Sequence, residues 1–241
     1  MEKLYFDFFF NQETLNIFTD ASVKTLQDGT VLSCPGSICV VTDDKGNTYR
    51  LEEDFDERNV VIGSTNNDGE IRAILLGIYY AIKYKNKFNY INLFSDSNTC
   101  IQGISDWIFK WINNMKKGIM YNSSNKPVAN QDNICSIINT IIENNININF
   151  YHQKGHVKNN DKGHDICFND FLCTNGIEMS MEIDLIKCIS FYNDYVDKQT
   201  KQTLNKFTNI YYNNESYKAT FNFTLKKGEI DNYKELIKRR I

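Results

Sequence analysis

The chain has 241 residues, of which 41% are hydrophobic and 24% are charged, and its formal net charge is -3. A chain of this length buries a sizeable core, and we expect one domain with an appendage rather than two domains. The net charge excludes nucleic-acid binding through the charge of the chain as a whole, so any such binding must depend on a local basic patch.

The seven cysteines are scattered and form no CxxC pair. This pattern is typical of reduced, mostly buried thiols in a cytosolic protein, and it offers no zinc site. The N-terminal residues lack the cationic start and the cleavage site of a signal peptide. No run reaches the roughly 18 apolar residues that a membrane span requires. We therefore expect a soluble, cytoplasmic protein.

Apolar runs in the first quarter of the chain predict strands, because they are rich in aromatic and β-branched residues. The runs are residues 4–10, 15–19, 37–42 and 48–52. The second run ends at Asp20 and Ser22, and a polar loop that includes residues 34–36 follows it. The turn at residues 43–47 contains Gly and Asn, which favour a hairpin. We expect an antiparallel meander of about three strands.

A helix is predicted next, because apolar residues recur at helical spacing. They are Ile71, Ile74, Leu75, Ile78, Tyr79 and Ile82. Residues 66–68 are expected to cap this helix, and Glu70 falls in its first turn. A first-turn glutamate is also an ordinary helix signal, since it interacts favourably with the helix dipole.

Residues 90–111 combine a strand with a helix. The β-branched and apolar run ends at residues 95–97, so we expect Asp96 to lie between the end of a strand and the start of a helix. The helix that follows has an apolar stripe made of Cys100, Ile101, Ile104, Trp107, Ile108 and Trp111. Taken alone, Asp96 is explained by capping of the first helical turn.

The rest of the pattern completes an α/β arrangement. A polar segment at residues 113–133 leads to a helix through residues 134–142, and a strand at residues 146–152 leads to His156. The order β-β-β-α-β-α-α-β is typical of a mixed sheet with helices on both faces.

In this order the segments resemble the successive motifs of type 1 ribonuclease H. The matching segments are IFTDAS, STNNDGEIRAILLGIYYAI, LFSDSNTCIQGISDWIFKW, KPVANQD and FYHQKGH. The resemblance covers roughly residues 15–203. It implies a ribonuclease H-like fold, with a mixed five-stranded sheet and helices on both faces. It also implies an endonuclease that hydrolyses the RNA strand of RNA–DNA hybrids and leaves a 5′-phosphate.

The resemblance implies a metal site made of carboxylates. Asp20, Glu70 and Asp96 match three ligands of two Mg²⁺ or Mn²⁺ ions. Paired hard cations need oxygen ligands, and together they stabilise the attacking water and the leaving oxygen. His156 matches a loop histidine that assists water attack or product release, a role suited to imidazole because it exchanges protons near neutral pH. A solvated loop histidine is the structural alternative.

The resemblance also implies contacts with the hybrid. Ser22, Thr65, Asn66 and Asn67 match residues near the metals that reach a phosphate or the 2′-hydroxyl, which only RNA offers. A second group resembles the helix and basic protrusion that grip the DNA strand, and it consists of Lys110, Trp111, Lys116, Lys117 and Lys126. This region is less basic than in bacterial members, so we expect weaker binding. A core stripe at Trp107 and Trp111 is the alternative.

The fourth metal ligand departs from the family pattern, in which Asn precedes the last Asp by four residues. Asp165 and Asp170 follow the histidine loop but lack this Asn, and their segment is expected to be a separate short helix that stops at Asn175 and Gly176. Asn193, in contrast, precedes Asp197 at the family spacing. An apolar stripe predicts a helix over residues 182–204 with Asp197 at its edge. We therefore expect Asn193 to bind nucleic acid or to orient a carboxylate, and Asp197 to complete the metal site. The structural alternative is that Asp197 is one of several charges on an exposed helix face.

Three ranges describe the expected organisation. They are a catalytic domain at residues 1–205, an insertion at about residues 160–190 and a C-terminal extension at residues 206–241 without a family counterpart. We expect a monomer that binds RNA–DNA hybrid and no membrane. A non-catalytic interaction module of the same fold is the main alternative function, and a DNA-strand nuclease is another, because fold alone does not define activity.

Overall fold

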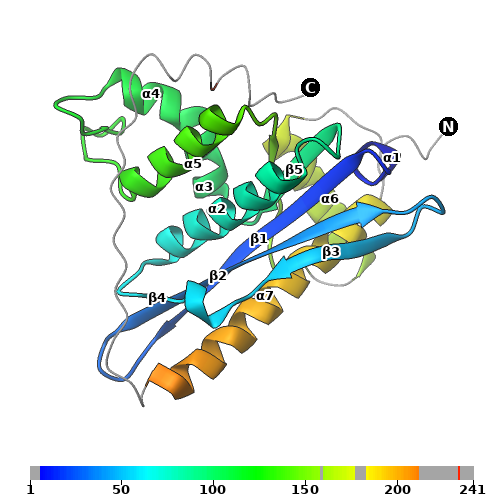
Figure 1. Cartoon of the computed structure of the whole chain (residues 1–241), viewed down its shortest axis with the longest axis horizontal. Helices are drawn as coiled ribbons and strands as arrows, with labels where there is room; N and C mark the ends of the chain where they lie inside the picture. The colour runs from blue at the N-terminus through cyan, green and yellow to red at the C-terminus, as the bar shows by residue number, and fades with distance from the viewer. Residues whose placement is uncertain (1–5, 158–159, 177–182, 212–232, 234–241) are drawn as a thin grey trace.

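The structure, a computed structural model, describes residues 6–157, 160–176, 183–211 and 233, and it is built around one mixed sheet (Figure 1). The strand order is β3-β2-β1-β5-β6, with β4 paired to β2. The strands are β1 (Thr14–Thr25), β2 (Val31–Thr42), β3 (Thr48–Asp54), β4 (Val61–Ile62), β5 (Tyr90–Ser95) and β6 (Asn149–His152). The first three strands are antiparallel, and β5 and β6 run parallel to β1. The predicted mixed sheet is confirmed, with β4 as a short sixth strand.

Helices cover both faces of the sheet (Figure 1). On one face lie α2 (Asn66–Tyr84), α3 (Asn98–Gln102), the π-helical turn η2 (Gly103–Trp107), α4 (Ile108–Asn113) and α5 (Gln131–Asn144). On the other face lie α1 (Phe6–Phe9), α6 (Asp161–Asn175) and α7 (Ile183–Tyr211). A short 3-10 helix, η1 (Glu57–Asn59), precedes β4. None of the described helices has the length and apolarity of a membrane-spanning segment.

Alternation along the strands produces two separate cores. Successive side chains of a strand point to opposite faces of the sheet. Leu15, Ile17 and Leu93 accordingly pack under α2, whereas Phe18 and Phe94 pack under α7. The rings of Phe18 and Phe94 are stacked with their centroids 4.8 Å apart. The central strands β1 and β5 are therefore buried on both faces.

Small residues bring α2 close to the sheet. Four buried residues recur at every fourth position and so share one side of the helix. They are Gly69, Ala73, Gly77 and Ala81. A Cβ atom added to Gly69 would lie 2.0 Å from Ser33 Oγ, and one added to Gly77 would lie 2.9 Å from a Leu93 methyl group. This close approach holds the neighbouring Glu70 beside β1.

The predicted strand at residues 4–10 is wrong where the structure describes it. Residues 6–9 form the short helix α1, and residues 4 and 5 lie outside the described part. The ring of Phe9 packs 5.9 Å from that of Phe94 and 5.1 Å from that of Tyr151. Side-chain packing thus buries the aromatic run, and a short apolar run does not by itself distinguish a strand from a helix.

The β1–β2 hairpin is longer than predicted. Strand β1 continues past Asp20 to Thr25, and residues 34–36 belong to β2 rather than to a loop. The two strands stay paired as far as the pair Thr25 and Val31. Along its other edge β2 pairs with β4 only up to Ser33 and with β3 only from Ser37 on, which leaves an unpaired stretch of the kind where proline is tolerated.

The expected insertion at about residues 160–190 contains helix α6 and the start of helix α7 among its described residues. Helix α6 ends at Gly176, whose positive φ of 65° suits a helix stop, as predicted. Helix α7 confirms the predicted helix at residues 182–204 from residue 183 on, whereas residue 182 lies outside the described part. It runs without a break through the expected domain boundary at residue 205. All seven cysteines are free, and five of them are buried.

Candidate active site

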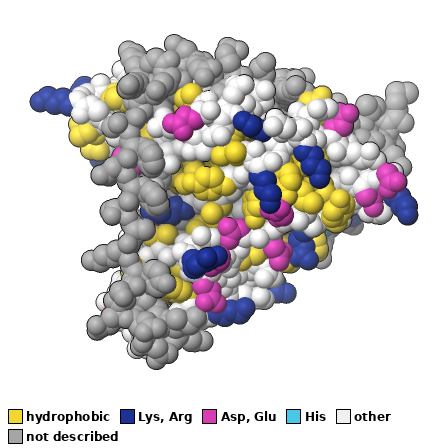
Figure 2. Space-filling model, viewed as in Figure 1, with side chains coloured by type: hydrophobic (Ala, Val, Ile, Leu, Met, Phe, Trp, Pro, Cys, Tyr) yellow, Lys and Arg dark blue, Asp and Glu magenta, His cyan; other side chains and the backbone are white. Residues whose placement is uncertain are grey.

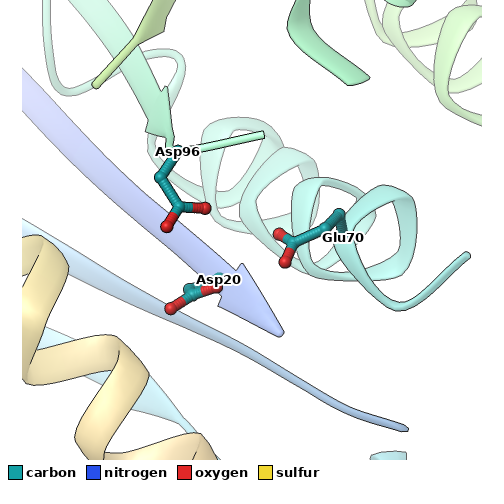
Figure 3. A group of neighbouring side chains, drawn as sticks. All are labelled: Asp20, Glu70 and Asp96. Carbon is teal, nitrogen blue, oxygen red and sulfur yellow. The ribbon is translucent and has the colours of Figure 1, made fainter. Parts of the chain in front are cut away.

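Three carboxylates from three elements point toward one another (Figure 3). Strands β1 and β5 pair in parallel, and their last pair is Thr19 with Ser95. The next residue of each strand is an aspartate, so the register places Asp20 and Asp96 side by side. Glu70 reaches them from α2, where it lies beyond the first turn in which it was predicted, because the helix already begins at Asn66. One oxygen atom of each carboxylate lies within 4.8 Å of the others.

Burial makes this group electrostatically unfavourable without a cation. Asp20 and Glu70 are each 4% exposed, and Glu70 Oε2 has no hydrogen-bond partner. Burial, with the nearby charges of Asp96 and Asp197, raises the pKa of Asp20 to about 8. Burial and the charge of Asp20 also raise the pKa of Glu70 well above its ordinary value. Like charges that share a buried site disfavour ionisation, and a bound cation removes this penalty.

The donor set fits a divalent cation. Only carboxylate oxygens converge in the compact group formed by Asp20, Glu70 and Asp96. Hard cations such as Mg²⁺ and Mn²⁺ prefer oxygen ligands, whereas zinc sites in proteins favour sulfur and nitrogen. The unpartnered oxygen of Glu70 is a further ligand atom without a competing hydrogen bond. The residues present therefore match a magnesium-type site.

All five residues predicted to be catalytic line one cavity of about 460 Å³. They are Asp20, Glu70, Asp96, His156 and Asp197. Asp197 comes from α7 on the other side of β1, and its Oδ2 lies 2.6 Å from Lys201 Nζ. It stands outside the compact group of three but close enough for its charge to raise the pKa values of Asp20 and Asp96. Asp165 and Asp170 are not among the residues that line this cavity.

The loop after β6 brings His156 and Gly155 to Asp96. His156 is exposed and has a left-handed φ of 53°. Burial raises the pKa of the Asp96 carboxyl, and the nearby His156 opposes this shift. The amide of Asn193 also lowers the pKa of Asp96 through a side-chain hydrogen bond, while its own Oδ1 is buried and unpartnered. Asn193 thus contacts a carboxylate of the group.

Two residues that sequence reasoning missed, His152 and Asn175, form a chain of hydrogen bonds to the main chain of Asp96. His152 Nε2 lies 3.2 Å from the main-chain oxygen of Asp96. The side chain of Asn175 bonds both the main-chain N–H and the main-chain oxygen of His152, each at 2.9 Å. Asn175 therefore takes the place of a neighbouring strand at the edge of β6. No sequence signal indicates this contact, since Asn175 was interpreted only as part of a helix stop.

The predicted RNA-contacting residues have different surroundings. Asn66 lines the carboxylate cavity. Ser22 also lines it, but its hydroxyl is 2.8 Å from that of Thr200 in α7. Thr65 is the N-cap of α2 and accepts a hydrogen bond from the N–H of Asp68, so the expected cap at residues 66–68 is wrong. The cap lies one residue earlier because the Thr65 hydroxyl is in reach of the third helical N–H.

A second cavity, of about 680 Å³, lies beside the first turns of α2 and α5. Its lining includes Asn67, Trp107, Lys110 and Trp111. The two indole rings meet edge to face with their centroids 5.9 Å apart. Trp107 is 38% exposed and so is not part of the core. The alternative in which Trp107 belongs to a core stripe is therefore wrong.

The remaining predicted basic residues lie outside both cavities. Lys116 and Lys117 are exposed, and Lys116 Nζ stands 5.6 Å from the centre of the Tyr121 ring. Two cations that were not predicted, Lys24 and Lys201, line the carboxylate cavity instead. Their spacing in the sequence carries no signal, because only the packing of α7 against β1 brings them together. On the face shown in Figure 2, basic and acidic side chains are interspersed among the described residues.

Comparison with known proteins identifies similar sequences. The family model described as RNase H matches residues 12–178. Ribonuclease HI of Haemophilus influenzae (strain ATCC 51907 / DSM 11121 / KW20 / Rd) is 31% identical over 158 residues, which are 65% of this chain and 90% of the relative. Ribonuclease H of Haemophilus influenzae (strain 86-028NP) is 31% identical over 169 residues, which are 69% of this chain and 92% of the relative.

Among solved structures, the solution structure of the PFV RNase H domain is 16% identical, with a TM-score of 0.44. The overlap covers 66% of this chain and 93% of that domain.

The match to the family model ends at residue 178, so Asp165 and Asp170 lie inside it, and Asn193 and Asp197 lie beyond it. The family match therefore spans Asp165 and Asp170, whereas the carboxylate cavity is lined by Asp197.

Proposed function

The chain belongs to the RNase H family of enzymes, and we propose that it hydrolyses the RNA strand of RNA–DNA hybrids with two divalent metal ions. The family match and the named relatives support ribonuclease H activity. The observation that carries the metal-dependent mechanism is the convergence of Asp20, Glu70 and Asp96 within 4.8 Å.

In this proposal Asp20, Glu70 and Asp96 hold the metal ions, and Asp197 completes the ligand set from α7. Two bound divalent cations supply charge stabilisation for the attacking and leaving oxygens of an in-line displacement. The raised pKa values of Asp20, Glu70 and Asp96 mean that these groups release protons when a cation binds. Asn193 orients Asp96, and Lys201 pairs with Asp197.

In this proposal His156 moves a proton at the exposed side of the cavity. It is exposed, lies on a short loop after β6 and is close enough to Asp96 to influence its pKa. Such a position suits proton transfer to or from water or a leaving group, or assistance in product release. The left-handed backbone of His156 turns the chain at this point and keeps its side chain beside the carboxylates.

The two cavities suit the two strands of a hybrid. Asn66 lines the carboxylate cavity, and in this proposal it bonds a ribose 2′-hydroxyl, which makes cleavage specific for RNA. The second cavity presents two indole rings and Lys110, a combination that suits a nucleic-acid strand through stacking or apolar contact and one phosphate contact. Asn67 lines this second cavity and continues the polar surface between the two.

The alternative of a non-catalytic interaction module is less well supported. Two buried carboxylates and a partly buried third that repel one another destabilise a fold, and a protein platform has no need of them. Cation binding and catalysis explain why this arrangement is present. A nuclease specific for DNA strands is disfavoured by the family match and by the polar residues at the RNA side of the cavity.

A cleavage assay with four labelled substrates tests the proposal. We expect the full chain to cleave the RNA strand of an RNA–DNA hybrid in Mg²⁺ or Mn²⁺, and to leave single-stranded RNA and both homoduplexes intact. EDTA and the Asp96→Asn variant are the controls, and both should abolish the products. Cleavage of all substrates alike, or cleavage in EDTA, would contradict it.

A further inference from the structure

Tyr233 is the one residue beyond α7 that the structure describes, and it is completely buried. It belongs to the core cluster on the α2 face of the sheet. Its ring lies 6.0 Å from the ring of Phe109 in α4, and its hydroxyl donates a hydrogen bond to the main-chain oxygen of Ile104 at 3.1 Å. A residue near the end of the chain therefore completes the core behind this helix.

The segment at residues 104–111 contacts Tyr233 on one side and lines the second cavity on the other. Ile104 and Phe109 face Tyr233, whereas Trp107 and Trp111 line the second cavity. Tyr233 thus lies behind the segment whose other side presents the two indole rings.

The backbone between these sides is irregular. Residues 103–107 form a π-helical turn, which is rare, is found mostly as a single turn inside α-helices and often occurs at functional sites. Trp111 packs over this turn, because a Cβ atom added to Gly103 would lie 3.2 Å from its ring. The position of the indole pair consequently depends on the shape of the turn. The hydroxyl of Tyr233 bonds a carbonyl oxygen of this same turn.

We infer that Tyr233 is a positioning residue for the second cavity: by holding Ile104 and Phe109 it fixes the turn that orients the tryptophan pair, and so it sets the affinity for the hybrid. This inference rests on the proposed function. It assigns a role to the C-terminal extension, which otherwise has no counterpart in the motifs of the family. The carboxylates come from β1, α2, the residue after β5 and α7, so the chemical step does not depend on this contact.

The test uses Tyr233→Phe in the full chain, with Tyr233→Ala as the larger perturbation. Trp107 and Trp111 are the two tryptophans of the chain, so intrinsic tryptophan fluorescence reports on this segment alone. We expect Tyr233→Phe to shift the emission and to increase quenching by acrylamide. We also expect KM for the hybrid to rise about 3- to 10-fold, as for the loss of one hydrogen bond, with kcat unchanged. A purely structural defect would instead lower the active fraction, and hence kcat, and leave KM unaltered.

Tyr192→Phe is the matched control. Tyr192 is also buried, and its hydroxyl donates to Thr48 Oγ1 at 2.9 Å in the core under α7. This control should leave the tryptophan emission unchanged. Emission, quenching and KM of Tyr233→Phe equal to those of the wild type would overturn the inference. If Tyr233→Ala fails to fold, the phenylalanine variant still decides. Absence of hybrid cleavage by the wild type would overturn the proposed function alone, because the fluorescence comparison requires no substrate.

Discussion

Gly155 lies directly against the carboxylate of Asp96, since a Cβ atom added to Gly155 would come within 2.3 Å of Asp96 Oδ2 and 3.2 Å of its Cγ. The φ angle of Gly155 is not positive, so its backbone suits alanine, and the cost of a side chain falls on Asp96. We expect Gly155→Ala to displace this carboxylate and to reduce kcat on hybrid by about 10²-fold, because small misplacements at a reacting centre have large effects.

The measurement is steady-state cleavage of hybrid in Mg²⁺, with a thermal melt to confirm folding. Lys154→Ala is the control, because Lys154 is the exposed neighbour in the same loop. Wild-type kcat for Gly155→Ala would mean that the exact position of Asp96 does not matter for turnover.

The carboxylates Asp20 and Asp96 are expected to be essential for cleavage but not for folding. Asparagine keeps their shape and removes the charge that a cation needs. Asp20→Asn and Asp96→Asn should each lower the cleavage rate by about 10³-fold or more, since cation stabilisation contributes several kcal/mol. Circular dichroism should show native secondary structure for both. Loss of folding in Asp20→Asn would instead indicate a structural role.

The stability of the metal-free protein should fall as the pH rises. The ordinary pKa of Asp20 is 3.8, and burial with its charged neighbours raises it to about 8. Between these values the folded state holds more protons than the unfolded chain, so the free energy of unfolding decreases with increasing pH. The raised pKa values of Glu70 and Asp96 act in the same direction.

Urea unfolding in EDTA at pH 5 and pH 8 measures this effect. We expect a decrease of at least about 1 kcal/mol, because one unit of pKa shift corresponds to about 1.4 kcal/mol. The decrease should be smaller in Asp20→Asn, and added Mg²⁺ should reverse it in the wild type. A stability that is constant or increases over this range would argue against the buried carboxylate group.

His156→Ala should slow turnover without preventing metal binding. The side chain is exposed at the open side of the cavity, where general acid–base or release assistance contributes about 10²-fold or more. Metal affinity, measured calorimetrically, should stay within a few-fold of the wild type, because the three converging carboxylates are intact. An unchanged rate at saturating Mg²⁺ would mean that His156 is only a solvated residue of its loop.

The fourth carboxylate is expected to be Asp197. It lines the cavity with the other three, whereas Asp165 and Asp170 do not. We expect Asp197→Asn to lose activity, and Asp165→Asn and Asp170→Asn to stay within about twofold of the wild type, as is usual for substitutions away from a site. The three variants are compared at equal metal and hybrid concentrations. Full activity of Asp197→Asn, with loss of activity in either other variant, would mean that Asp165 or Asp170 is the fourth carboxylate, at the short spacing of the family.

Much of the architecture was already present in the local pattern of residues. The helical period of α2 and α5, the turn at residues 43–47 and the order of strands and helices along the chain all follow from spacings within single segments. These spacings reflect the geometry of a single helix or strand, which does not depend on distant residues. The same reasoning failed at residues 6–9, where the burial of Phe9 comes from contacts with β5 and β6 rather than from its own segment.

The sequence by itself also determined the candidate carboxylates, because Asp20, Glu70 and Asp96 occur in motif order beside a strand or helix signal. Only the tertiary structure decided that they converge, through the pairing of Thr19 with Ser95 and the close approach of α2. It likewise brought Asp197 to the cavity, placed Asn175 at the edge of β6 and buried Tyr233 behind α4. These relations join residues far apart in the chain. They depend on strand register and on which helix packs against which face, and no local period encodes either of them.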